Sequence, residues 1–74
     1  MEFRYDRIRE LREKHNYSLS VAVRLLKSRA GFRLSRGGFS MWETGRMLPS
    51  LPGLMALSEL YGVDPGYFFE PRTS

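Results

Sequence analysis

Residues 33–46 read RLSRGGFSMWETGR, and the fold of the chain depends on how this stretch is organised. Ser35 is a typical helix N-cap, and Phe39 and Trp42 follow three residues apart on one helical face. Gly45 is a typical C-terminal stop. The stretch therefore predicts a short amphipathic helix between the serine and the glycine.

Two adjacent glycines lie inside this expected helix. Gly37 and Gly38 should each weaken it by about 0.5–1 kcal/mol relative to alanine. Two explanations fit this cost: the backbone approaches a partner closely here, or the helix begins later, near Phe39. The sequence alone leaves both explanations open.

Helical periodicity continues on both sides of this stretch, and no segment alternates as a strand does. Cap and stop residues divide the chain into four or five short helices, over about residues 4–16, 18–30, 35–44, 50–61 and 65–70. The expected N-caps are Ser18, Ser35, Ser50 and Asp64. The fourth helix is expected to turn inward Leu51, Leu54, Leu57 and Tyr61. We therefore expect a single all-α domain over residues 1–74, folded as a compact bundle.

The 74-residue chain has a net charge of +4, and its basic residues are concentrated in one part of it. Between Lys14 and Trp42 there are six basic residues and no acidic one. A segment of one sign favours a polyanionic partner, although solubility alone is another reason for so small a charge. The absence of cysteine indicates a reducing, cytoplasmic compartment, and no apolar run approaches the roughly 20 residues of a membrane span.

Catalytic and metal-binding patterns are missing from the sequence. His15 is the only histidine, and no cysteine, glycine-rich phosphate loop or metal-ligand spacing accompanies it. We therefore expect no enzyme activity, no cofactor and no metal site, and no small-molecule ligand is evident.

Two segments carry a resemblance to a known family: RIRELREKHNYS at residues 7–18 and LSRGGFSMWETGRMLPSLPGLMALSELYGVDPGYFF at residues 34–69. They resemble the Cro/C1-type, or XRE, helix-turn-helix domain of bacterial and phage regulators. The most specific part is an ordered block with the pattern W-E-x-G-x-x-x-P-S. Its members here are Trp42, Glu43, Gly45, Pro49 and Ser50.

The resemblance implies a lambda-repressor-like fold and a transcriptional regulator, more in the manner of a repressor, that binds double-stranded DNA in the nucleoid. The helix that starts near Ser35 would lie in the major groove, with Phe39 and Trp42 packed on the core. It also implies that Glu43 pairs with Arg12 of the first helix. The alternatives are a protein–protein interaction module of the same fold and a non-specific DNA-binding protein.

Carried over position by position, the resemblance assigns DNA contacts to eight residues. The groove-facing positions are Ser35, Arg36, Gly37, Ser40 and Met41. Arg36 is the candidate base reader, for a guanine, and a phosphate contact is the alternative. The positions that clamp phosphates are Ser18, Thr44 and Arg46. Arg29 and Arg33 are added to these on their charge alone, because they are basic residues of a segment that the family lacks and that would lie near the duplex.

That segment lengthens the link between the two motif helices, about 18–30 and 35–44, and is similar to the link of EspR-type actinobacterial regulators. Either the second helix is longer or the turn carries an excursion. Lys27, Arg29 and Arg33 in this segment would contact phosphates, or they are solvated while Phe32 fills the core. Leu19 stands where the family often has a phosphate-binding glutamine.

A homodimer is possible, because helix-turn-helix proteins generally bind two half-sites. Three aromatic residues near the C-terminus are candidates for the contact, and at least one of them is expected to close the core of its own chain. They are Tyr67, Phe68 and Phe69.

Overall fold

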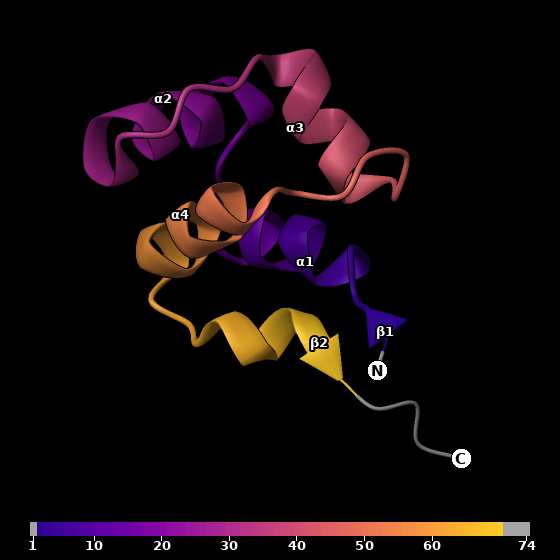
Figure 1. The fold of residues 1–74 in the computed structure, drawn as a ribbon. Coiled ribbons are helices and arrows are strands. Elements are labelled where there is room, and N and C mark those ends of the chain that lie inside the picture. Colours follow the sequence, from indigo (N-terminus) through magenta and orange to yellow (C-terminus); the bar gives the residue numbers. More distant parts are fainter. Residues whose placement is uncertain (1, 71–74) are drawn as a thin grey trace.

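The computed structural model describes residues 2–70, and almost all of its regular structure is helical (Figure 1). The elements in chain order are strand β1 (Glu2–Phe3), helices α1 (Asp6–Lys14), α2 (Leu19–Ala30), α3 (Arg36–Glu43) and α4 (Leu51–Tyr61), the 3-10 turn η1 (Pro65–Phe68) and strand β2 (Phe69–Glu70). In Figure 1, α2 and α3 form an upper layer, α1 and α4 lie beneath them, and η1 lies at the bottom. The expected all-α bundle is confirmed.

Four side chains cap these elements as expected. Backbone N–H groups donate to the side-chain oxygens of Ser18, Ser35, Ser50 and Asp64, over 3.1, 3.0, 3.3 and 2.7 Å. Each bond satisfies one of the free amides in the first turn of its helix. At the opposite ends, α2 and α4 are closed by left-handed glycines, Gly31 and Gly62.

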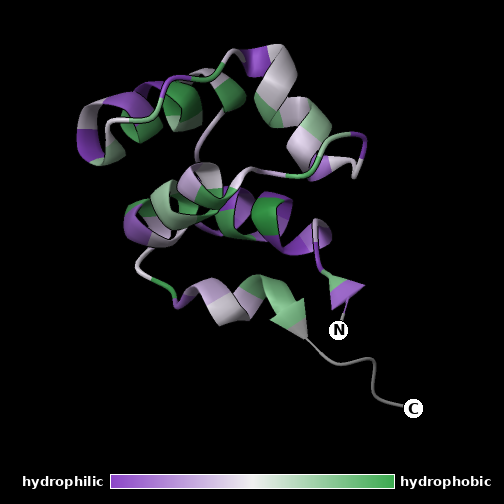
Figure 2. Ribbon diagram, viewed as in Figure 1, coloured by the Kyte–Doolittle hydropathy of each residue, from purple (hydrophilic) through white to green (hydrophobic). Residues whose placement is uncertain are grey.

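The core lies where the two layers meet, and each helix turns one apolar face toward it (Figure 2). The largest fully buried side chains are Phe39, Phe68, Ile8, Leu26 and Leu57. They come from five different elements, so the core joins α1 to α4 and η1 into one unit. Burial of such side chains contributes about 1.5–3 kcal/mol each relative to full exposure.

Two short strands depart from the prediction that the chain has none. Glu2 pairs with Glu70 and Phe3 with Phe69 in an antiparallel ladder, and the Arg4 N–H donates to the Phe68 carbonyl over 2.7 Å. Strands this short cannot show an alternating pattern, which is why the sequence did not reveal them. The ladder ties the start of the described chain to its end.

One of the four residues expected to turn inward from the fourth helix is exposed instead. Leu54, Leu57 and Tyr61 are buried as predicted, but Leu51 is 71 % exposed. At 100° per residue, Leu51 lies beside Met55 on the one sector that faces solvent. The helix carries apolar residues on all sides, so periodicity could not distinguish its inner face from its outer face.

Candidate nucleic-acid interface

The α3 helix has one buried face and one free face. Phe39 and Trp42 are 0 % and 2 % exposed, and their rings pack 5.9 Å apart within the core. The opposite face consists of exposed Arg36, Gly37 and Met41, beside a half-buried Ser40. The buried face holds the helix on the body of the domain, and the free face is available to a partner.

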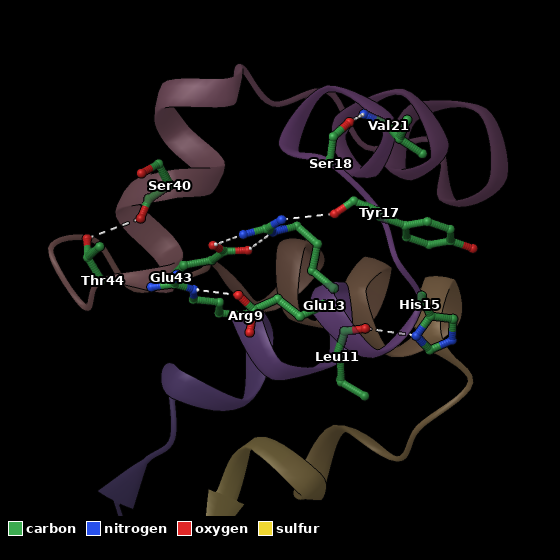
Figure 3. A network of polar contacts seen from close by, with 11 residues as sticks. Arg9, Leu11, Glu13, His15, Tyr17, Ser18, Val21, Ser40, Glu43 and Thr44 are labelled. Carbon is green, nitrogen blue, oxygen red and sulfur yellow. Dashed lines mark hydrogen bonds and ion pairs between the residues drawn. The ribbon is translucent and has the colours of Figure 1, made fainter.

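A buried ion pair fixes the C-terminal end of α3 (Figure 3). Arg12 of α1 donates to both carboxylate oxygens of Glu43, over 2.6 and 3.1 Å, and its third bond goes to the Tyr17 carbonyl over 2.9 Å. The side chains of Arg12 and Glu43 are only 14 % and 6 % exposed. The hydrogen bonds that Arg12 donates to Glu43 raise the pKa of the Arg12 guanidinium further above its usual value, so the guanidinium stays charged. It joins α3 to α1.

The position of the N-terminal end of α3 decides between the two explanations for Gly37 and Gly38. The helix begins at Arg36 directly after the Ser35 cap, so a later start near Phe39 is excluded. A Cβ on Gly38 would lie 2.7 Å from the Leu34 Cδ1 atom, so a side chain at this position would require Leu34 to move. A Cβ on Gly37 would meet nothing closer than the Ser35 hydroxyl at 4.0 Å. Only Gly37 leaves space that a partner can enter.

One contact on this surface was not foreseen from the sequence. The Arg36 Nη1 donates to the Ser20 hydroxyl of α2 over 3.3 Å. Ser20 lies two residues after the Ser18 cap, on the exposed first turn of α2, and only the folded chain brings it beside α3. The contact places the Arg36 guanidinium over the junction of the two helices.

The residues expected to clamp phosphates occupy exposed helix ends. Ser18 caps α2. The Thr44 hydroxyl donates to the Ser40 carbonyl over 3.1 Å, at the end of α3 (Figure 3). Arg46 is exposed, and Gly45 beside it has a φ of 77° that only glycine adopts easily. The hydroxyls of Ser18 and Thr44 are thus already engaged with backbone, whereas the Arg46 side chain is exposed in the following turn.

Some of the added residues between the motif helices lengthen the second helix, and the rest form an excursion in the turn. Helix α2 runs to Ala30, and residues 31–35 then form an extended link that returns along it (Figure 1). Phe32 of the link packs against Trp42, with ring centroids 5.7 Å apart. Leu19, in place of the family's glutamine, is half-buried and packs against the core.

This region carries four exposed cations: Arg24, Lys27, Arg29 and Arg33. Within residues 2–70, none of the four side chains forms an ion pair or a hydrogen bond. Arg24 was not among the predicted DNA contacts. It lies one helical turn before Lys27 and Ser28, so the sequence already indicated that it shares a face of the helix with Lys27. The region formed by α2 and the link that leads into α3 therefore carries four positive charges that no carboxylate within residues 2–70 pairs with.

Groups of metal ligands do not occur among the described residues, whether near this surface or elsewhere. His15, the one histidine, directs its Nδ1 to the Leu11 carbonyl over 2.8 Å (Figure 3). Its ring also packs against Tyr61, with centroids 5.2 Å apart. This histidine therefore has a structural environment.

The comparison with known families agrees with this geometry. A family model described as Helix-turn-helix matches residues 8–68, which is most of the chain, and the chain belongs to this family. The family is that of the Cro/C1-type, or XRE, regulators, which are DNA-binding proteins. No curated protein and no solved structure gives a significant match. The described part of the chain has no helix long and apolar enough to cross a membrane.

Proposed function

We propose that this DNA-binding regulator acts as a repressor in the cytoplasm, by occupying nucleoid DNA with the free face of α3 in the major groove. The observations that carry the proposal are the free face of α3 and the four exposed, unpaired cations on α2 and on the link that leads into α3. A helix that enters the major groove brings its first turns to the base edges, while flanking cations neutralise phosphates.

Each residue of the interface then has a role that follows from its chemistry. Arg36 donates two bonds to the O6 and N7 atoms of a guanine, which discriminates against other bases by about 1–3 kcal/mol. Met41 offers an apolar contact to a thymine methyl, and Gly37 allows close approach of the backbone. The remaining polar contacts, which hold the duplex in place, come from Ser18, Arg29, Arg33, Ser35, Ser40, Thr44 and Arg46.

A titration of duplex DNA at two salt concentrations tests this arrangement. The double variant Arg29→Ala/Arg33→Ala should weaken binding and reduce the salt slope by about two units, because each phosphate contact releases about one counterion. Arg9→Ala is the matched control, because Arg9 is an exposed arginine of α1 whose partner, Glu13, belongs to the same helix. An unchanged salt slope in the double variant would exclude the link from the interface.

Non-specific DNA binding is the second candidate, and the exposed Gly37 favours it because a glycine reads no base. Selection of bound sequences from a random pool distinguishes the two. A common motif that the Arg36→Ala variant no longer enriches supports sequence-specific recognition. Equal binding of all sequences supports the second candidate, and binding to no duplex at any salt concentration would leave a protein–protein interaction module.

The dimer that two half-sites require is proposed to form through α4 and the loop before it. Exposed apolar side chains gather there: Met47, Leu48, Leu51 and Met55. Residues 47–58 contain no charge, which is typical of a surface that a protein partner covers. Of the three aromatic candidates, Phe68 is fully buried in its own chain, and Tyr67 and Phe69 pack partly against the core.

Sedimentation at several concentrations tests the dimer. Leu51→Asp should produce a monomer of unchanged helical content, because Leu51 contributes little to the core of its own chain. Glu10→Ala is the control, since Glu10 is an exposed residue of α1. A wild-type chain that stays monomeric at all concentrations and on DNA would exclude this interface.

A further inference from the structure

A hollow of about 370 Å³ lies between α2 and the link that returns along it. Its lining comes from both segments: Val23, Arg24, Lys27, Arg33, Leu34 and Ser35. Volumes of this size are typical of sites for small molecules, whereas a phosphate held at a protein surface needs no hollow. The site is a product of the lengthened link, since Arg33, Leu34 and Ser35 form one of its walls.

The lining has two chemical parts. Val23 and Leu34 are half-buried side chains that present an apolar surface. Arg24, Lys27 and Arg33 stand around them as exposed cations. None of these cations forms an ion pair within residues 2–70, and residues 14–42 of the sequence contain no carboxylate. The hollow therefore combines an apolar surface with positive charge that the chain itself does not compensate.

We infer that this hollow binds a small amphipathic anion, with an apolar or aromatic body against Val23 and Leu34 and a carboxylate or similar head on Arg24, Lys27 and Arg33. Guanidinium groups bind carboxylates by two parallel bonds, which fixes the orientation of the head. The apolar contacts supply affinity that a bare inorganic anion lacks. The ligand class is thus set by the two parts of the lining together.

Occupancy of the hollow should also oppose DNA binding, and this step rests on the proposed function. Arg33 is a proposed phosphate contact and also lines the hollow. An anion that neutralises Arg33 and Lys27 removes positive charge from the DNA-binding surface. A ligand of this class would therefore release the protein from its operator.

The probe for the site is 1-naphthoate, whose fused rings and carboxylate match the two parts of the lining. Amide chemical shifts of the isotopically labelled protein alone, without DNA, should change saturably at the lining residues, with a Kd on the order of 0.1–1 mM. The neutral amide of the same shape, 1-naphthamide, should bind at least about threefold more weakly because it lacks the charge. Acetate, which lacks the rings, should produce no saturable change.

Two variants with the same change in charge make the test specific. Arg24→Gln should weaken 1-naphthoate at least about threefold, and Arg9→Gln should leave its affinity unchanged. The folded state of each variant is checked by circular dichroism. Each of three outcomes would overturn the proposed site: 1-naphthoate and 1-naphthamide bind equally, the two variants weaken binding equally, or the lining amides show no saturable change.

The effect on DNA is measured separately, on a duplex that the protein binds. Saturating sodium 1-naphthoate should raise the Kd for the duplex at least about threefold relative to the same concentration of sodium acetate, which controls for ionic strength. If 1-naphthoate binds the hollow but the affinity for DNA does not change, the proposed competition with DNA is overturned and the binding site is supported. Failure of the chain to bind any duplex would overturn the proposed function, and the test of the site without DNA would still apply.

Discussion

The two ends of α3 are held in different ways. At the C-terminal end, Glu43 is buried and bonded twice by Arg12, and the aromatic core lies directly beside it. At the N-terminal end, Ser35 caps the first turn and Arg36 is exposed, with one long bond to Ser20 as its contact within the described chain. One arginine is thus satisfied inside the fold, and the other is available at the surface.

This difference separates the residues that build the domain from those available for binding. A charge that is buried and paired is costly to expose alone, so it specifies how α3 docks on α1. An exposed charge without a carboxylate partner contributes little to stability and remains free to meet a phosphate. Substitutions at the C-terminal end of α3 should therefore change mainly stability, and those at the N-terminal end mainly DNA binding.

Removal of Arg12 should have the largest effect on stability. Arg12→Ala leaves the Glu43 carboxylate buried without its partner, and we expect a loss of about 2–4 kcal/mol in the free energy of unfolding. Urea denaturation measures this loss. Arg36→Ala, the matched change at the other end of α3, should stay within about 0.5 kcal/mol of the wild type. A loss below about 1 kcal/mol for Arg12→Ala would contradict the structural role of the pair.

The turn after α3 should be the next most sensitive position. Gly45 has a φ of 77°, and an added Cβ would lie 2.8 Å from the Tyr5 ring. Gly45→Ala should cost about 1–3 kcal/mol from the combined backbone strain and steric overlap, measured by urea denaturation. If the overlap contributes, Tyr5→Ala should recover part of that cost in the double variant. Full additivity of the two changes would show that the cost comes from the backbone alone.

Much of this arrangement could be predicted from the sequence, because it depends on local chemistry. The caps Ser18 and Ser35 act within one turn, so the sequence signal and the structural outcome involve the same few residues. The packing of Phe39 and Trp42 followed from helical spacing. The exposed face of Leu51 was missed because α4 is apolar on every side.

Contacts between distant segments were harder to foresee. The Ser20–Arg36 bond and the hollow beneath Arg33 depend on the path of the link, which no local pattern determines. The pairing of Glu43 with Arg12 across 31 positions was expected only through the resemblance to the family. Local propensity therefore predicts the elements, whereas side-chain contacts between elements require the three-dimensional path of the chain.

The two glycines of α3 should respond differently to the same change. Gly37→Ala adds a methyl group in open space and should stabilise the fold by about 0.5–1 kcal/mol. Gly38→Ala gains the same propensity but forces Leu34 to move, so it should be less stable than Gly37→Ala by about 1 kcal/mol or more. Urea denaturation of the two variants measures the difference. Equal stabilisation would show that Leu34 yields without cost.

The smallest effect should come from the buried hydroxyl of Tyr61, which is close enough to the Arg12–Glu43 pair to feel both charges. The Tyr61 hydroxyl is buried and lacks a hydrogen-bond partner among the described residues. At about pH 7, Tyr61→Phe should therefore leave stability unchanged or raise it by up to about 1 kcal/mol, because it removes a polar group whose burial is not compensated. Tyr5→Phe is the control, since Tyr5 is 43 % exposed.

The pH dependence of Tyr61 sharpens this test. Burial raises the pKa of Tyr61 well above its usual value, so in strong base the unfolded chain releases this proton before the folded chain does. The contribution of Tyr61 to stability is thus fully present below about pH 10 and declines as the pH rises further. Tyr61→Phe should make the loss of stability between about pH 9 and pH 11 shallower. Identical slopes for wild type and Tyr61→Phe would mean that the hydroxyl reaches water in the folded state, and that its surroundings are more open than its burial indicates.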